Sequence, residues 1–526
     1  MQLHDFLARG YFPKELPPPF TTVPFADFVT ATNLTIDPRP GTTARGLITR
    51  ACAHDLARPG NLRRALQIPH PLNYYQLCDV ISKEWGNIDA HLNKAALSLT
   101  RPVQDPLAFR AVRTQREGGE LPHIRAQNRA TSRVILKADI SRFYPSIYTH
   151  SIPWALDGKA AAKKVRSGGL GNDLDLFLRN SQDGQTLGIP IGPDASLVVA
   201  EIIGAAIDSE LEKSGLKGFR FMDDFEFVFP SRQQAEAAIP RIEHVLREYE
   251  LALNSFKTSV EDLPRPLERR WVDTLRYFDP AETGHMDQSD VLRYFDLAFS
   301  LREAEPSEAI LSYAIARLRS VVVDGDAWEL FQDLMFQCVM VEPGCLQSVV
   351  SLFHQKGTRA VSPKFGNALE QVIALHAPLG HASEVAWAVW AAIWFKLELS
   401  GATALILSTQ ADSVVALLAL HARDAGYIDA AADFSDWEAM MTQDSLYDGN
   451  WLLAYEAEIK GWLPTQGHVD ADPNLSQLKA AGVSFYDVNV ATPTIRPVAT
   501  GPYGEPLPTF SAREAPNVED DDDLSF

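Results

Sequence analysis

The run FRFMDDFEFVF (219–229) constrains the fold of this 526-residue chain more than any other segment. Aromatic side chains occupy every other position on both sides of Asp223-Asp224. A period of two is typical of β-strands, and neighbouring aspartates favour a turn. We therefore expect a hairpin that carries both carboxylates at or near its tight turn. Taken alone, the pattern also suits an ordinary Asp-rich turn.

A second strand is predicted by VILKAD (134–139), which ends in Asp139, and Ser141 to Pro145 can start a helix. If Asp139 faces Asp223 and Asp224, the three carboxylates repel one another unless a cation joins them. Magnesium is a hard cation that binds carboxylate and phosphate oxygens. Two such ions, about 3.5–4 Å apart, activate a 3′-hydroxyl and stabilise departing pyrophosphate. Carboxylates from two neighbouring strands are the ligands that this chemistry needs.

The segment GQTLGIPIGPDASLVVAEIIGAAID (184–208) lies between these two. Its glycines and prolines predict a loop that enters a long apolar helix over 195–212. Small residues in such a loop let a nucleotide or a nucleic-acid backbone approach closely. A plain loop before a helix is the alternative.

The three segments in this order resemble the reverse transcriptases. DISRFY (139–144) resembles motif A, GIPIGPDAS (188–196) motif B, and FMDD (221–224) the YxDD box. LNSFKT (253–258) resembles motif D, and RRALQIP (63–69) resembles the fingers segment RPLGIP. The likeness covers about residues 60–275. It is closest to the bacterial defence-associated reverse transcriptases of the abortive-infection type.

The resemblance implies a metal and catalytic set. Asp139, Asp223 and Asp224 would ligate two Mg²⁺ ions, with Mn²⁺ as an alternative, and the backbone carbonyl of Ile140 would be a further ligand. Lys257 matches the motif D lysine, which protonates departing pyrophosphate or holds the triphosphate.

The resemblance also implies a substrate-binding set. Tyr144 stands where an aromatic ring excludes a 2′-hydroxyl and so selects dNTPs. Arg64 matches the fingers arginine, whose guanidinium fork suits phosphate oxygens, and Arg63 would assist it or be a surface charge. Gly192 and Ser196 would shape the motif B loop.

Two positions depart from the family pattern. Phe221 replaces the Tyr of YxDD, which keeps the ring and removes the hydroxyl. Ile191 replaces a Gln that helps position template and nucleotide in related enzymes. The replacement by Ile191 fits an enzyme with relaxed or absent templating. It does not decide between templated and untemplated synthesis.

The net charge of −20 first argues against a nucleic-acid partner, because phosphates repel an acidic chain. Residues 1–275, however, carry 34 basic and 32 acidic side chains, which gives +2, and residues 276–526 carry 14 and 36, which gives −22. Salt screens charges beyond about 8 Å, so the acidity of one half of the chain need not prevent the other half from binding nucleic acid. The acidity therefore bears on the second half, for which protein–protein assembly is the better expectation.

The expected fold class is α+β, with fingers and palm followed by an all-α domain. We expect an irregular segment over 1–60, a fingers–palm domain over 61–275, a helical domain over 285–465 and a flexible Pro-rich acidic tail over 490–526. Helix pairs recur about every 40 residues in the helical domain, which suits a HEAT-like stack, with an irregular bundle as the alternative. Val385–Phe395 is too short for a bilayer, which needs about 20 residues, and predicts a buried helix. Four scattered cysteines predict neither a zinc site nor a disulfide framework.

The resemblance implies an anti-phage DNA polymerase with dNTPs as substrates and self-association through the helical domain. We expect it in the cytoplasm, with no membrane partner. One version is untemplated and primed on a tyrosine of the protein, which leaves the DNA covalently attached. The other copies a partner non-coding RNA. Two alternatives are a catalytically silent scaffold that binds a phage or host protein, and a palm-type cyclase. The three aspartates disfavour the scaffold, and the fingers and motif B segments disfavour the cyclase.

Overall fold

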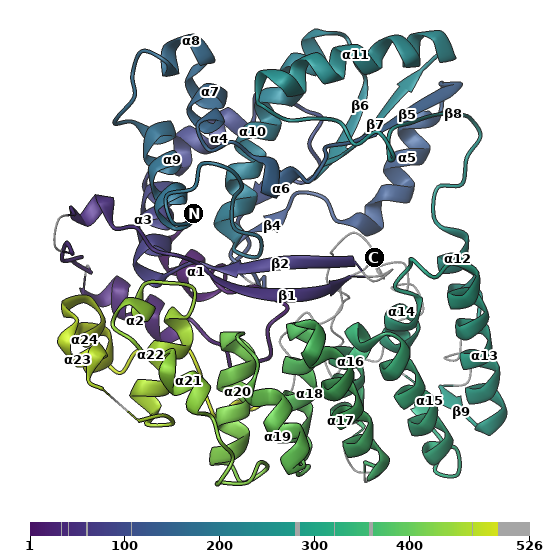
Figure 1. Cartoon of the computed structure of the whole chain (residues 1–526). Helices are drawn as coiled ribbons and strands as arrows, with labels where there is room; N and C mark the ends of the chain where they lie inside the picture. The colour runs from purple at the N-terminus through teal and green to yellow at the C-terminus, as the bar shows by residue number, and fades with distance from the viewer. Residues whose placement is uncertain are drawn as a thin grey trace.

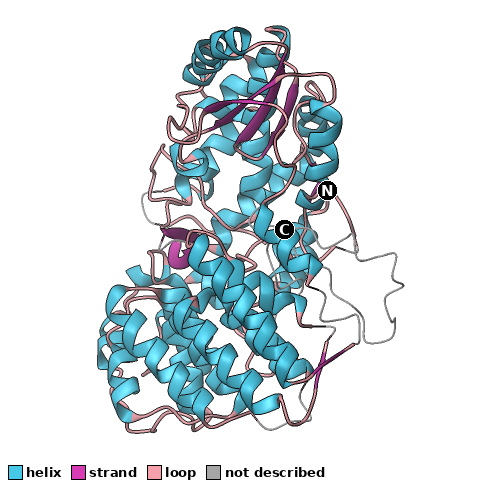
Figure 2. Ribbon diagram, turned by 90° about the vertical axis from the view of Figure 1, so that its right-hand side faces the viewer, coloured by secondary structure: helices cyan, strands magenta, loops and turns pink. Residues whose placement is uncertain are grey.

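The computed structural model describes residues 1–492 except 33, 40–41, 59–61, 107, 279–283, 320, 357–360 and 465. The acidic tail expected over 490–526 lies almost wholly outside these residues. The chain forms an upper region that contains the main β-sheet and a lower array of helices, with the hairpin β1–β2 between them (Figures 1 and 2).

The main sheet is antiparallel, with the strand order β6-β7-β5-β8. The hairpin predicted from the aromatic run is present as β6–β7, and its turn is Met222-Asp223. The predicted strand 134–139 is present as β5, which pairs with β7 and places Asp139 directly opposite Asp224. The strands are β5 (Val134–Asp139), β6 (Gly218–Phe221), β7 (Asp224–Phe229) and β8 (Ser259–Asp262).

Two helices pack on or next to this sheet, and the long apolar one was predicted from the sequence. Helix α11 (Arg232–Glu248) packs on β5, β7 and β8, and helix α10 (Asp194–Lys213) packs on α11. The Ser231 side chain caps α11 by accepting from the backbone N–H of Gln234, which satisfies a donor that the helix cannot pair internally. Most of α10 is buried, as its continuous apolar sequence predicts.

The N-terminal segment differs from the irregular one expected. It contains α1 (Leu3–Ala8), α2 (Val23–Thr32) and strand β1 (Cys52–Arg58), which pairs with β2 (Leu62–Ile68). A domain boundary at residue 60 therefore cuts a hairpin. The two helices are short and are stabilised by tertiary burial of Phe6 and Phe25, which are 0% exposed, so their periodicity is too brief to read in sequence.

The lower array consists of helices that stand side by side (Figure 1). Most of these helices contact the helix two places further along the chain, as in the pairs α13·α15, α14·α16, α15·α17, α16·α18, α17·α19, α18·α20 and α20·α22. The apolar run Val385–Phe395 lies within α18 (Ala382–Phe395), and its residues up to Ile393 are buried, which confirms the buried helix. Among the described residues, no helix has the length and hydropathy required to span a bilayer.

The ends of the described chain meet. Tyr11 stacks on Tyr74 with ring centroids 4.3 Å apart, and Phe485 packs edge-on against Tyr11. Phe20 forms an isolated antiparallel bridge with Tyr486. The N-terminal segment is thus enclosed by the upper region and by the segment that follows the last helix.

The other elements connect or extend these parts. All four cysteines are buried and unpaired. The upper region also holds α3 (Pro71–Lys83), α4 (Trp85–Leu92), β3 (Pro102–Val103), β4 (Arg113–Thr114), α5 (Leu121–Arg129), α6 (Phe143–Ser146), α7 (Ser151–Asp157), α8 (Lys159–Ala162) and α9 (Leu170–Asn180). The lower region holds α12 (Arg270–Tyr277), β9 (His285–Met286), α13 (Gln288–Ala304), α14 (Ile310–Arg317), β10 (Val322–Val323), α15 (Trp328–Val341), α16 (Leu346–Gln355), α17 (Lys364–His376), α19 (Gly401–Ser408), α20 (Ser413–Asp424), α21 (Ser435–Ala439), α22 (Trp451–Lys460), α23 (His468–Ala471) and α24 (Pro473–Ala480).

Candidate active site

Three carboxylates lie together at one end of the sheet. Asp139 is the last residue of β5, Asp224 is its cross-strand partner, and Asp223 is in the turn that precedes Asp224. The backbone N–H of Ile140 donates to the carbonyl of Asp223 at 3.0 Å, which ties the turn to the chain after β5. The sheet register therefore brings together the acids that the sequence predicted.

The electrostatics of this cluster favour a cation. The pKa of Asp224 is raised to about 7, first by loss of hydration and then by the charges of Asp223 and Asp139. The pKa of Asp223 is also raised, again by burial first and by Asp139 second. Carboxyl groups that raise one another's pKa bind a divalent cation readily, because the cation relieves the repulsion.

Lys257 is brought to the same place by the loop after α11. Its Nζ lies 2.7 Å from Oδ2 of Asp139, and the pKa of Lys257 is raised despite partial burial, because Asp139 and the other two aspartates favour its charged form. The backbone N–H of Asn254 donates to the carbonyl of Asp139 at 2.8 Å and fixes this loop beside β5. The ammonium group is therefore held where negative charge concentrates.

A buried ion-pair network supports the turn that carries Asp223. Arg220, on β6, is fully buried and donates to both Asp208 and Glu201 of α10 at 2.8–3.1 Å. Its Nη1 also donates to the carbonyl of Met222, and the N–H of Met222 donates to Oγ1 of Thr100. Met222 has a positive φ of 57°, an uncommon conformation for a side-chain-bearing residue, which these contacts stabilise.

Gly204 makes room for this network. It lies on α10 between Glu201 and Asp208, and a Cβ at this position would be 2.5 Å from Nη2 of Arg220. Glycine usually weakens a helix interior. Here it lets the guanidinium lie against the helix backbone.

The motif B loop is fixed by contacts from the N-terminal segment. Gly192 has a φ of 125°, and a Cβ there would be 2.5 Å from Cγ of Pro13. Asp194 accepts from Nε and Nη2 of Arg110 and from the N–H of Val112, and its own N–H donates to the carbonyl of Gly10. The expected role of Gly192 in shaping the loop thus has a physical basis.

Ser196 lies in the first turn of α10 and is 1% exposed. Ile191, the departure from the family pattern, uses its carbonyl to accept from the N–H of Gln67 on β2 at 2.9 Å. The loop is therefore joined to the hairpin β1–β2 as well.

Tyr144 is the last residue of motif A, lies on α6 and packs against the core. Its pKa is raised by burial first, then by the charges of Glu201 and Asp223, while Arg64 opposes the shift. The carbonyl of Tyr144 accepts from the N–H of Ile189 in the motif B loop. The Tyr144 hydroxyl is therefore within the electrostatic reach of Glu201, Asp223 and Arg64, and its backbone is tied to the motif B loop.

The hairpin contributes two arginines to the site, of which the sequence predicted one. The charge of Arg64 lowers the pKa of Asp223, against the larger opposing effect of burial. Arg58, on β1, has its pKa lowered by burial first and by Arg64 next, and it also interacts with Asp223 and Asp139. Arg63 is not brought to this cluster: it pairs with Asp55 at 2.6 Å and with Glu384 of α18.

Residues 88–278 match the family model described as reverse transcriptase (RNA-dependent DNA polymerase). These residues form a reverse transcriptase domain. The enzyme class predicted from the sequence, an RNA-directed DNA polymerase, is confirmed. The matched range begins after the hairpin β1–β2, so the fingers assignment of residues 63–69 stays a prediction.

The reverse transcriptase domain has no counterpart among the curated proteins compared, none of which matches the chain. A solved structure that resembles the chain is that of apo telomerase from Candida tropicalis, with 11% sequence identity and a TM-score of 0.31. The similarity covers 78% of this chain and 70% of the telomerase chain.

Several residues at the reverse transcriptase site were not predicted from the sequence. Arg58 is the clearest, since it directly precedes the sequence Pro59-Gly60-Asn61, whose residue types favour a turn and could have suggested that Arg58 shares a hairpin with Arg64. Arg220 sits one residue from the predicted FMDD box, but its partners are on another element. Arg110 offers no local signal, because its partner Asp194 is 84 residues away.

Proposed function

We propose that this reverse transcriptase adds deoxynucleoside monophosphates to a hydroxyl primer at the site formed by Asp139, Asp223 and Asp224. The observation that carries the proposal is the sheet register, which sets Asp139 opposite Asp224 beside the turn residue Asp223. The mutually raised pKa values of Asp223 and Asp224 fit a divalent cation. Two Mg²⁺ ions held here, with the carbonyl of Ile140 as a further ligand, would lower the barrier by polarising the attacking and leaving oxygens.

The other residues bind and orient the substrate. Arg58 and Arg64 supply positive charge on the side of the site formed by the hairpin, where a triphosphate would need it. Lys257 holds a proton next to Asp139, in position to donate to departing pyrophosphate. The ring of Tyr144 excludes a 2′-hydroxyl, and the fixed loop at Gly192 and Ser196 borders the nucleotide.

The variant Asp223→Asn tests the metal assignment, since it keeps the shape of the side chain and removes its charge. We expect primer extension with Mg²⁺ and dNTPs to fall by at least about a hundredfold, with an unchanged circular dichroism spectrum. Asp157→Asn, at the exposed end of α7, is the matched control and should extend normally. Extension by Asp223→Asn at the control's rate would exclude this residue as a ligand.

We also propose that synthesis is untemplated and primed on the protein. Ile191 in place of the family Gln supports this, since an apolar side chain cannot hydrogen-bond a template or nucleotide base. Among the described tyrosines, Tyr277 is the exposed one, at 90%, and it is therefore the first candidate primer; Tyr503 lies outside the described residues.

The test incubates purified protein, treated with nuclease, with Mg²⁺ and labelled dNTPs alone. DNA that stays with the protein after denaturation, and that maps by mass spectrometry to a tyrosine, is the expected result. Tyr277→Phe should remove it if Tyr277 primes, whereas Tyr75→Phe, a partly buried tyrosine, should not. Product that forms only when RNA is supplied favours the alternative, copying of a partner non-coding RNA.

An anti-phage role is proposed from the likeness of the motifs to the abortive-infection enzymes. From α13 to α20, most of the lower helices contact the helix two places further along the chain, which supports the HEAT-like stack expected there. Phage plating on cells that express wild-type protein or Asp223→Asn tests this role. Equal plating would refute it.

Self-association through the helical array is a further part of the proposal. Leu375, Leu379 and Leu405 are 56–69% exposed and lie on α17, the 3₁₀ turn Ala377–Leu379 and α19, which contact one another. Exposed leucines on contacting elements suit a second copy of the chain. Light scattering should show an oligomer that Leu405→Glu dissociates; a wild-type monomer would contradict this.

A further inference from the structure

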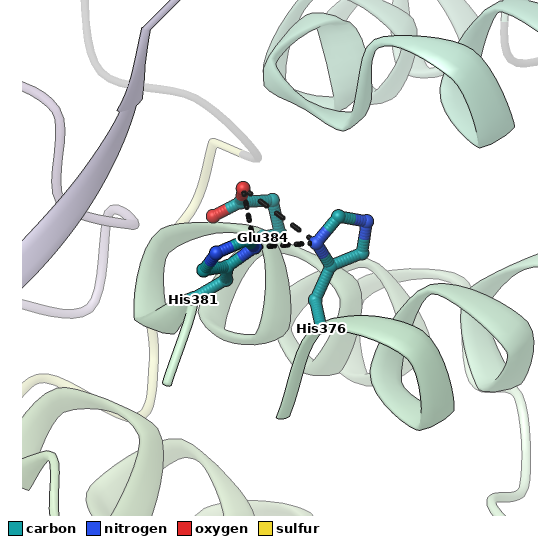
Figure 3. A group of neighbouring side chains, drawn as sticks. All are labelled: His376, His381 and Glu384. Atoms are coloured by element: carbon teal, nitrogen blue, oxygen red, sulfur yellow. Dashed lines mark hydrogen bonds and ion pairs between the residues drawn. The ribbon is translucent and has the colours of Figure 1, made fainter. Parts of the chain in front are cut away.

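A second group of metal-ligating side chains lies outside the polymerase site. His376 ends α17, His381 precedes α18, and Glu384 is in the first turn of α18 (Figure 3). The Nδ1 atoms of the two imidazoles are 2.9 Å apart, and each lies 3.8 Å from Oε1 of Glu384. All three ligand atoms thus lie within 3.8 Å of one another.

The spacing of these atoms matches zinc. In a triangle with sides of 2.9, 3.8 and 3.8 Å, the point equidistant from the corners lies about 2.1 Å from each. Zinc binds histidine nitrogen and carboxylate oxygen at about 2.0–2.2 Å. An ion near this point would therefore bind all three with little movement of the side chains.

The surroundings prepare these groups to bind a cation. The side chains of His376, His381 and Glu384 are 18%, 26% and 3% exposed, so the carboxylate is buried and the two imidazoles are partly buried. Burial lowers the pKa of His376, and the charge of Glu384 opposes this shift. A neutral imidazole is the form that binds a metal.

Glu384 is oriented by a second set of contacts. Nη1 and Nη2 of Arg63 donate to its two oxygens, and the hydroxyl of Ser383 donates to Oε2. The charge of Arg63 is balanced by Asp55, whose Oδ2 lies 2.6 Å from Nε. A carboxylate oxygen can accept from Arg63 and bind an ion at once, because it has two lone pairs.

We propose that His376, His381 and Glu384 form a zinc site, with water as the fourth ligand. The ion would fix the turn between α17 and α18 and, through Glu384 and Arg63, the hairpin that carries Arg58 and Arg64. This proposal stands on the geometry of the three side chains and does not depend on the polymerase activity.

The experiment measures metal on the full chain in an Asp223→Asn, Asp224→Asn background, so that the palm carboxylates contribute less. After chelation and dialysis against Zn²⁺, mass spectrometry should find one more zinc ion per chain than in the same protein with His376→Gln or His381→Gln. His244→Gln, an exposed histidine on α11, is the matched control and should keep the ion. Equal zinc content in all four proteins would overturn the proposal.

Cobalt gives a readout that does not depend on any variant. Co²⁺ added to the metal-free chain should produce the intense visible absorption of a tetrahedral site, and one equivalent of Zn²⁺ should remove it. The absence of this absorption in the unaltered chain would also overturn the proposal. If His376→Gln fails to fold, the zinc content of His381→Gln, whose side chain is more exposed, is compared with that of the protein with all three ligands.

Discussion

The substitution Gly204→Ala probes how firmly the Arg220 network supports the catalytic turn. An added Cβ would be 2.5, 2.7 and 2.9 Å from Nη2, Cζ and Nη1 of Arg220. Ordinary contact needs about 3.5 Å or more, so the guanidinium must move by roughly 1 Å. Bonds of 2.8–3.1 Å to Glu201 and Asp208 would then be broken or badly stretched.

The magnitude follows from two opposing effects. Disrupting a buried ion pair costs about 3–5 kcal/mol, and replacing Gly by Ala in a helix gains about 1 kcal/mol. We therefore expect the free energy of unfolding to fall by about 2–4 kcal/mol. Because Arg220 also binds the carbonyl of Met222, the turn with Asp223 should shift, and primer extension should fall by about a hundredfold.

Urea denaturation and a primer-extension assay measure the two effects. Gly366→Ala, on α17, is the matched control, because a Cβ there meets nothing within 4 Å. The control should be stabilised by up to about 1 kcal/mol and should extend normally. If Gly204→Ala behaves like Gly366→Ala, the close packing of Arg220 against α10 is refuted.

Three further outcomes are expected. Tyr144→Val should raise the use of rNTPs relative to dNTPs by about ten- to a hundredfold in single-nucleotide extension, while Tyr148→Val should not. If the two variants have the same rNTP/dNTP ratio, Tyr144 is not the steric gate. Asp224 binds its proton more tightly in the folded chain (pKa about 7) than in the unfolded chain, so its ionisation destabilises the fold as pH rises from about 4 to 7. Asp224→Asn should therefore raise the melting temperature at pH 8 and have little effect near pH 4. The same difference in melting temperature between variant and wild type at both pH values would contradict this. For the same reason Mg²⁺ should raise the melting temperature of the wild-type chain more at pH 8 than at pH 5, and much less in Asp224→Asn.

Local sequence patterns predicted individual strands and helices whose buried faces are set by neighbouring residues. The aromatic alternation gave the hairpin β6–β7, and the continuous apolar runs gave β5, α10 and the buried helix α18. In each case neighbouring residues determine both the element and the buried face. The three aspartates were predicted for the same reason, since each lies at the end or turn of such an element.

The supports of the site could not be read in this way, because they join residues far apart in the chain. His54 on β1 bonds to Asp412, 358 residues away, and Arg63 bonds to Glu384, 321 residues away. No period or motif links such positions. Arg63 shows the consequence: its place beside Arg64 suggested a phosphate contact, but strand alternation sends neighbouring side chains to opposite faces.

The enclosure of the N-terminal segment bears on how the protein matures in the cell. Pro13 and Gly10 support the motif B loop, and Tyr11 between them packs against Phe485. While the ribosome is still making the helical array, the nascent chain already contains every catalytic residue. It still lacks Phe485, which packs against Tyr11 in the complete chain. Apolar surface exposed in this way leaves a chain incompletely ordered. We therefore expect nascent chains to remain inactive until residues 485–486 emerge, which would delay DNA synthesis until the helices that accompany the polymerase are also in place.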